Sequence, residues 1–244
     1  MRIETLVFYF CALTAFPAPL FAAPEIIESI AVIGTGEVGG TLGKRWAGAG
    51  HRIVYGSRTP EAERVAKLVS ETGGGTIATT PGEAAKQANI VLLAVPWSAF
   101  KDTVQSLGDL GGKVIIDPIN YFKPVGGYPG PLDGQSIAQQ VQAMMPGAKV
   151  VKAFNTLGSE IMVDPKLAGG PVTIPLAGDD REAKARVANL VKDAGLEPMD
   201  MGPLSVSVFI EGMLGLYVSY RKYNPGKGFE FYLRPMPDII NSDR

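Results

Sequence analysis

Short apolar runs alternate with amphipathic stretches along most of the chain. The runs predict strands, and the stretches with helical spacing predict helices. Between residues 28 and 168 this alternation is typical of βαβ units, so we expect an α/β fold with a doubly wound parallel sheet. The run 89–95 is almost wholly apolar, as expected for a central strand buried on both faces. The expected strands are 29–34, 52–56, 75–78, 89–95, 113–117 and 148–154, and the expected helices are 37–49, 60–72, 81–88, 98–107 and 134–145.

A smaller C-terminal α+β region is expected at residues 169–221. It contains a strand-like run at 171–177, an amphipathic helix at 179–194, a short strand at 196–200 and a largely apolar helix at 203–221. Residues 222–244 form a tail that is rich in proline and aromatic residues.

The first 23 residues have the order of parts found in a secretory signal peptide. Arg2 precedes an apolar or neutral stretch at 6–16, and the prolines at 17–19 lead to Ala22-Ala23. The stretch is too short and too broken by proline for a transmembrane helix. We therefore expect a periplasmic or secreted protein without a transmembrane domain; the alternative is a cytoplasmic protein whose start codon is placed too early.

Composition excludes several classes of function. The 244 residues are 46% hydrophobic and 19% charged, with a net charge of −1, and no basic face suggests nucleic acid. The one cysteine, Cys11, lies in the N-terminal apolar stretch, which leaves the folded body no disulfide, iron–sulfur cluster or thiol catalyst. No His/Cys/Glu cluster has the spacing of metal ligands, so no metal site is predicted.

The strongest chemical signal is Gly34-Thr35-Gly36-Glu37-Val38-Gly39, which lies between the first expected strand and the first expected helix. In G-x-G-x-x-G the first glycine permits the turn, and the second lets backbone N–H groups approach a pyrophosphate. The third lets the helix pack close to the strand, and the helix dipole favours the anion. Residues 34–39 are therefore predicted to bind a dinucleotide in a Rossmann fold.

The residues after the second strand predict which dinucleotide binds. An NAD site has Asp or Glu here to accept hydrogen bonds from the ribose 2′-OH. This chain has Ser57-Arg58 instead, and a guanidinium beside a hydroxyl suits a 2′-phosphate. The predicted cofactor is therefore NADP(H).

Ligands of an open parallel sheet bind beyond the carboxyl ends of its strands. Val95-Pro96-Trp97 follows a central strand and is expected either to contact the cofactor or to begin a helix around a core tryptophan. Asn155-Thr156 ends the strand 148–154 and either hydrogen-bonds the carboxamide or an incoming ring, or caps the next segment.

A side chain for acid–base chemistry is not evident. His51, the one histidine, begins the second strand and is expected to be a surface turn residue. Tyr121 and Lys123 lie near the expected crevice, but no Tyr-x-x-x-Lys helix is present. No catalytic side chain is therefore predicted, which favours hydride transfer between nicotinamide and another conjugated ring, where the protein supplies proximity and orientation.

Together these motifs resemble the coenzyme F420-dependent NADP oxidoreductases, from about Ile30 to Val218. The chain is also similar to the cytoplasmic oxidoreductase domain of the six-transmembrane ferric reductases. Both resemblances imply a Rossmann domain that holds NADPH across the strand ends and passes a hydride to a flavin-like ring. The segments that carry them are 32–39, 55–60, 93–97, 151–156, 176–180 and 201–205.

The resemblance also implies roles for individual residues. Thr35 to Val38 would surround the pyrophosphate, and Pro96-Trp97 would flank the cofactor. Main-chain groups of Leu157 and Ser159 would contact the nicotinamide carboxamide. The acceptor side would be lined by Pro203, Leu204, Ser205 and Ser207.

The chain departs from the family pattern at three positions. Val206 replaces an Asn, Val208 replaces an Arg of the acceptor segment, and Ala62 stands where a second basic residue often occurs. Loss of that arginine weakens the case for an acceptor with an anionic tail. The predicted function is hydride transfer between NADPH and a flavin or F420-type ring. The alternatives are a non-catalytic NADP-binding module and a reductase of small imines or carbonyls. Helix 203–221 either packs on the Rossmann domain or forms a homodimer.

Overall fold

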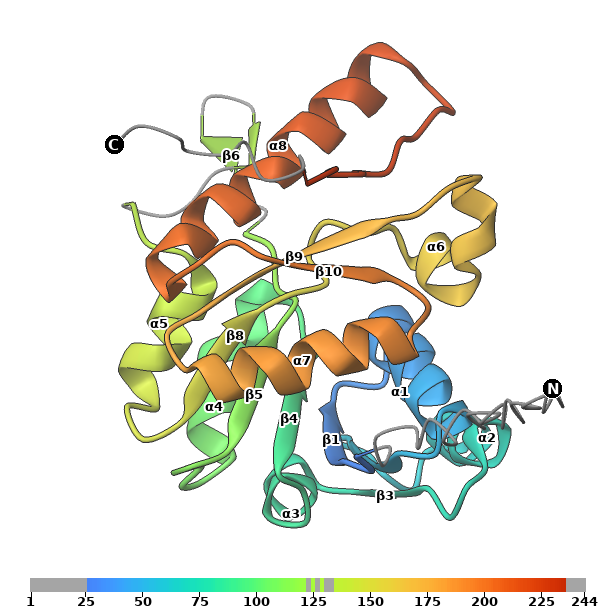
Figure 1. Ribbon diagram of the computed structural model, residues 1–244. Coiled ribbons are helices and arrows are strands. Elements are labelled where there is room, and N and C mark those ends of the chain that lie inside the picture. The colour runs from blue at the N-terminus through green and yellow to red at the C-terminus, as the bar shows by residue number, and fades with distance from the viewer. Residues whose placement is uncertain (1–25, 122–123, 126–127, 130–133, 236–244) are drawn as a thin grey trace, which may run out of the picture.

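The computed structural model describes residues 26–121, 124–125, 128–129 and 134–235. The predicted signal peptide at 1–23 and Lys123 lie outside these residues. Within them, one large sheet carries helices on both faces, as Figure 1 shows. This is the doubly wound α/β arrangement expected from the sequence.

The main sheet consists of β1 (Ser29–Ile33), β2 (Arg52–Gly56), β3 (Ile77–Thr79), β4 (Ile90–Leu93), β5 (Val114–Asp117), β8 (Lys149–Lys152), β9 (Thr173–Gly178) and β10 (Glu197–Asp200). Their order is β10-β9-β8-β5-β4-β1-β2-β3. All neighbours pair in parallel except β8 and β9, which are antiparallel. The strand order reverses between β1 and β4, and the crevice beyond the carboxyl ends at such a reversal is where these folds bind ligands.

One face of the sheet is covered by α1 (Glu37–Gly48), α6 (Ser159–Val163) and α7 (Arg181–Asp193), with α2 (Glu63–Thr72) beside α1. Trp46 of α1 is fully buried in this layer. Its indole N–H donates to the Leu190 carbonyl at 2.8 Å, and its ring meets Phe154 edge-on at 5.8 Å. A single aromatic side chain therefore joins α1, α7 and the end of β8.

The opposite face is covered by α3 (Pro81–Lys86), α4 (Phe100–Ser106) and α5 (Ile137–Met144). The long helix α8 (Ser207–Tyr223) crosses above the β8–β9 end, next to the small hairpin of β6 (Pro124–Val125) and β7 (Tyr128–Pro129) (Figure 1). This helix, which the sequence analysis placed in a separate C-terminal region, therefore packs against β7 and β9.

The structure differs from the expected elements mainly after β5. Because β9 and β10 continue the main sheet, the strands expected in a smaller region share one sheet with the Rossmann strands. The short helix α6 and the 3₁₀ turn Pro165–Ala168 were not expected, nor was the β6–β7 hairpin. The last helix begins at Ser207, after a 3₁₀ turn at Leu204–Val206.

The expectation that His51 is a surface turn residue is wrong. The side chain is buried, with 7% of its surface exposed. Its Nδ1 accepts from the backbone N–H of Glu28 at 3.0 Å, and its Nε2 lies 3.0 Å from an Asp193 carboxylate oxygen. The end of α7 covers the turn that leads into β2, so His51 joins two elements far apart in sequence.

Candidate functional site

The glycine turn fits tightly between the ends of three strands. Gly34 has a φ of +106° and its N–H donates to the Gly56 carbonyl at 3.0 Å. A Cβ atom on Gly34 would lie 2.1 Å from the carbonyl oxygen of Ala94, and one on Gly39 would lie 2.1 Å from that of Gly34. The chain therefore needs glycine at these two positions to bring α1 against β1 and β4.

Gly36 differs from Gly34 and Gly39, because neither its backbone conformation nor the neighbouring atoms require a glycine. Its φ of −81° and ψ of −168° are open to any residue, and a Cβ atom here would meet nothing within 4 Å. It precedes α1, whose N-terminus has no side-chain cap. An exposed, uncapped helix N-terminus with room for a close approach fits the pyrophosphate of a dinucleotide.

A cavity of about 920 Å³ opens from this turn across the ends of β2 and β4. Ser57 is buried and its hydroxyl accepts from the Thr59 N–H at 3.2 Å, which fixes the turn. Arg58 is exposed beside it and has no ion-pair or hydrogen-bond partner among the described residues. The cavity therefore offers an uncommitted guanidinium where the sequence predicts the 2′-phosphate.

Arg64 is a cavity residue that sequence reasoning did not assign. It lines the cavity, and its guanidinium donates to the Thr35 hydroxyl of the glycine turn at 2.8 Å. The family pattern often has a second basic residue at position 62, but here this position is Ala62, the residue before α2. Because α2 begins at Glu63, Arg64 lies in its first turn and reaches the site from there.

The loops after β4, β5 and β8 meet beside the cavity. Trp97 packs edge-on against Tyr121 at 4.9 Å between ring centres. Asn120 donates to the Asn155 carbonyl at 2.6 Å, and Asn155 donates to the Asn120 side-chain oxygen at 3.1 Å. The side-chain oxygen of Asn155 is buried without a hydrogen-bond partner among the described residues. Asn155 is 4% exposed and does not line the cavity, so its oxygen is an unsatisfied buried acceptor.

The remaining predicted cofactor residues have mixed surroundings. Val95 and Pro96 line the cavity, whereas Trp97 does not. Leu157 is buried in the core, so only its main chain is open to a ligand. Ser159 donates to the Glu37 carboxylate at 3.2 Å and thereby ties α6 to the glycine turn.

The predicted acceptor-side residues lie elsewhere. Leu204 is buried and its N–H donates to the Asp179 carboxylate at 2.8 Å. Asp180, which follows Asp179, forms an ion pair at 3.1 Å with Lys149, the first residue of β8. Gly178, the last residue of β9, pairs with Val151 of β8, and the loop 201–206 leads from β10 into α8. Ser207 is fully buried and its hydroxyl contacts that of Ser136 at 2.6 Å. The structure does not bring Pro203, Leu204, Ser205 and Ser207 to the cavity.

A buried ionic cluster joins the carboxyl ends of β5 and β8 to α8, and no local sequence pattern predicts it. Lys152 is fully buried, with Nζ 3.1 Å from Asp117 Oδ2 and 2.7 Å from Glu211 Oε1. It also donates to the Ile119 carbonyl, so all three N–H bonds are used. Burial raises the pKa of Glu211 despite the opposing charge of Lys152. Because all three N–H bonds of Lys152 are used, this side chain holds α8 in place and has no N–H group left to donate to a ligand.

The described ranges, 26–121, 124–125, 128–129 and 134–235, also bear on metal binding and membrane spanning. They contain no group of three or more His, Cys, Asp or Glu residues arranged to hold a metal ion. None of their helices is both long and apolar enough to span a membrane.

Known proteins match this chain over its Rossmann portion and beyond. The family model for "NADP oxidoreductase coenzyme F420-dependent" matches residues 29–121. The F420-dependent NADP reductase of Methanothermobacter marburgensis is 30% identical over 208 residues, covering 78% of this chain and 91% of that protein. The crystal structure of a candidate F420-dependent NADP reductase from Arthrobacter sp. FB24 has a TM-score of 0.77 at 29% identity. It covers 85% of this chain and 100% of that one.

A second group of relatives is longer. The metalloreductase STEAP3 of Rattus norvegicus is 26% identical over 227 residues, which cover 84% of this chain and 43% of that protein. The chain therefore spans less than half the length of this curated relative.

Proposed function

Because the chain belongs to the family of coenzyme F420-dependent NADP oxidoreductases, we propose that it transfers a hydride between NADPH and the ring of a flavin or of the deazaflavin F420. The observation that carries the NADPH half is the cavity in which the glycine turn, Ser57 and the unpaired Arg58 converge. NADPH, when bound, supplies the hydride from its nicotinamide ring.

The chain's own residues would bind and orient the two rings. The N–H groups at Gly36 and the start of α1 would hold the pyrophosphate, while Arg58, Ser57 and Arg64 would hold the 2′-phosphate. Hydride transfer between two conjugated rings asks of the protein mainly proximity and orientation.

The acceptor is tested by mixing the purified protein and NADPH with FMN, FAD or F420 and following absorbance at 340 nm. Oxidation with at least one ring is expected, and Arg58→Ala should slow it at low NADPH. Tight NADPH binding without oxidation by any of the three would contradict the proposal. That outcome would favour a non-catalytic NADP-binding module, for which Val206 and Val208 in the acceptor segment are the supporting observation.

Arg58→Ala is expected to reduce NADPH affinity about ten- to hundredfold while leaving NADH affinity nearly unchanged. The charged hydrogen bonds to a phosphate that it removes contribute about 1.5–3 kcal/mol. Isothermal titration calorimetry with both nucleotides measures this. The matched control is Arg52→Ala, since Arg52 is also exposed but lies at the start of β2, whereas Arg58 follows its end. Equal losses for NADPH and NADH would show that Arg58 does not read the 2′-phosphate.

Gly36→Ala is expected to leave the unfolding midpoint within about a degree or two and to lower dinucleotide affinity at least tenfold. The added methyl group meets no protein atom within 4 Å but occupies the space of the approaching pyrophosphate. Thermal unfolding and calorimetric titration check the two halves separately. Unchanged affinity for both nucleotides would contradict the proposal that the pyrophosphate binds at Gly36.

We also propose a homodimer formed through α8. Phe209, Leu216 and Tyr223 are 74%, 61% and 70% exposed and follow one another at intervals of seven residues, so they lie along one side of the helix. Phe209→Glu with Leu216→Glu should convert a dimer to a monomer in sedimentation velocity. A monomeric parent protein would contradict this. Export through residues 1–23 stays a prediction.

A further inference from the structure

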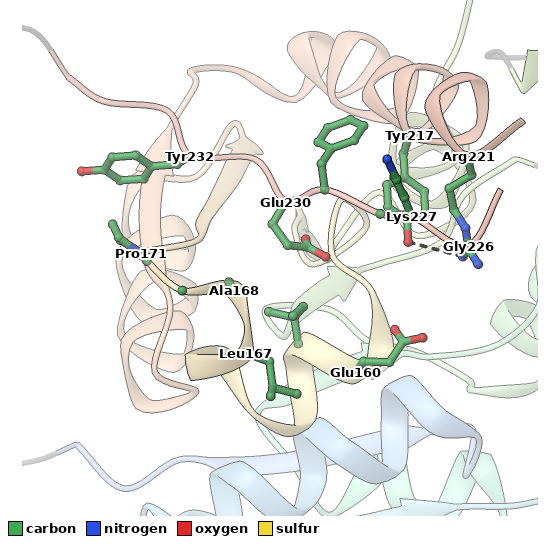
Figure 2. Close-up of a pocket in the computed structure, with 15 residues that line it drawn as sticks. Glu160, Leu167, Ala168, Pro171, Tyr217, Arg221, Gly226, Lys227, Glu230 and Tyr232 are labelled. Atoms are coloured by element: carbon green, nitrogen blue, oxygen red, sulfur yellow. Dashed lines mark hydrogen bonds between the residues drawn. The ribbon is translucent and has the colours of Figure 1, made fainter. Parts of the chain in front are cut away.

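A second cavity of about 550 Å³ lies between α6, the loop before β9, the end of α8 and the segment that follows it. Figure 2 shows Glu230 near its centre, with Glu160 on α6 and Tyr217 and Arg221 on α8 around it. None of its lining residues lines the dinucleotide cavity. Its volume is in the range of sites for small organic ligands.

The aromatic wall of this cavity is held in place by contacts that do not need a ligand. Phe229 packs against Tyr220 at 5.2 Å and against Phe231 at 4.9 Å between ring centres. The Phe231 carbonyl accepts from the Thr173 N–H at 2.9 Å, which attaches this segment to β9. The cavity is therefore formed in advance, with a flat apolar surface on one side.

The polar side of the cavity carries two carboxyl groups without a cation. Neither Glu160 nor Glu230 forms an ion pair within 4.0 Å among the described residues. One oxygen of Glu230 is buried with no hydrogen-bond partner there. Burial, together with the charge of Glu160, raises the pKa of Glu230 to about 7, although the Gly158 N–H donates to it and opposes the shift. A half-buried carboxyl group with one buried, unpartnered oxygen lacks a positive partner.

The remaining charged and titratable groups do not supply that partner. The Arg221 guanidinium lies over the Tyr217 ring at 5.7 Å and donates to its hydroxyl at 3.4 Å. Arg221, Lys227 and Tyr232 line the cavity at its exposed rim, where Glu160 is also exposed, whereas Glu230 is half-buried. The inner surface near Glu230 thus presents negative charge next to aromatic rings.

We propose that this cavity is a second binding site, which takes an organic ammonium ion with an aromatic or apolar body. The ammonium group would lie between Glu230 and Glu160, and its N–H groups would satisfy the unpartnered oxygen of Glu230. The body would pack on Phe229 and Tyr217. A cation is favoured over a neutral donor because it also relieves the repulsion between the two carboxylates.

Binding of such a cation must be linked to a proton. The carboxyl of Glu230 is mostly protonated at pH 6 and mostly ionised at pH 8, so the affinity should rise about tenfold between these values. At pH 6.5, binding should release about three quarters of a proton. An anionic ligand would instead take up a proton or exchange none.

The test uses the whole chain and three probes that share a phenyl ring: benzylammonium, benzyl alcohol and benzoate. Titration calorimetry at pH 6, 6.5 and 8, in buffers of different ionisation enthalpy, gives affinity and proton exchange together. We expect benzylammonium to bind at pH 8 at least tenfold more tightly than the other two. Glu230→Gln should abolish both the pH dependence and the proton release, while Glu63→Gln, an exposed glutamate on α2, should change neither.

Three results would overturn the site: no benzylammonium binding at pH 8, equal or tighter binding of benzoate or benzyl alcohol, or unchanged linkage in Glu230→Gln. Thermal unfolding and NADPH affinity of Glu230→Gln show whether the variant is folded. If it is not, Glu160→Gln serves, with a loss of at least fivefold in benzylammonium affinity expected.

Discussion

Lys152→Met should destabilise the protein by about 3–5 kcal/mol, because it removes the one cation from a buried cluster and leaves two carboxyl groups facing each other. Lys152 and Asp117 are fully buried and Glu211 is 4% exposed, so water cannot replace the lost partner. Urea denaturation measures the free energy of unfolding.

The control for this prediction lies on the same strand. Lys149 begins β8 and pairs with Asp180 at 3.1 Å, but both side chains are about one-third exposed. Lys149→Met should therefore cost less than about 1 kcal/mol. Equal costs at the two positions would mean that burial does not set the strength of the Lys152 cluster. Replacing all three members, as Asp117→Asn, Lys152→Met and Glu211→Met, should recover most of the loss, since no uncompensated charge remains.

The cluster also bears on the site, because it attaches α8 next to the nicotinamide-side loops. Asn155 donates to the Ile210 carbonyl at 3.1 Å, one residue before Glu211. Phe154, between Lys152 and Asn155, has a φ of +64°, an uncommon conformation for a side chain of this size. The bend it makes turns the chain from β8 towards Asn120, so the buried charges and the strained residue together hold Asn155 in place.

Local patterns predicted the N-terminal half of the fold well. Runs of apolar residues located β1, β2, β4 and β5, and the G-x-G-x-x-G spacing located the turn at Gly34, because both depend on neighbouring residues. The antiparallel pairing of β9 with β8 depends on contacts between residues 25 and 27 positions apart. Nothing in the local sequence encodes that direction.

Two buried polar residues, Lys152 and His51, were not predicted to be buried, for the same physical reason. Lys152 looks like a surface lysine at a strand end, yet Glu211, 59 positions later, makes its burial tolerable. His51 was misjudged for the same reason, since its partner Asp193 is 142 positions away. Local sequence predicts that a polar residue is exposed, because the distant partner that would stabilise it in the core is not visible there. Arg64 was missed because the exact start of α2 decides which side chain faces the glycine turn.

Gly34→Ala is expected to destabilise the protein by about 2–5 kcal/mol and to abolish NADPH binding. The new Cβ would lie 2.1 Å from the Ala94 oxygen and 2.8 Å from its carbon, and these are backbone atoms of the neighbouring strand end that cannot rotate away. Overpacking of this kind costs about 1–3 kcal/mol, and a φ of +106° adds about 1–2 kcal/mol for any residue other than glycine.

Gly50→Ala separates the two contributions to the Gly34 prediction. Gly50 has a φ of +92°, but a Cβ there would meet nothing within 4 Å, so only the backbone term applies. Its expected cost is about 1–2 kcal/mol, with NADPH affinity unchanged. Urea denaturation and NADPH titration of both variants make the comparison. If Gly34→Ala costs no more than Gly50→Ala, the end of β4 yields easily, and the close fit of the turn would not be what shapes the pyrophosphate site. If it costs several kcal/mol more, the geometry that excludes a side chain at Gly34 is also what leaves room for the dinucleotide at Gly36.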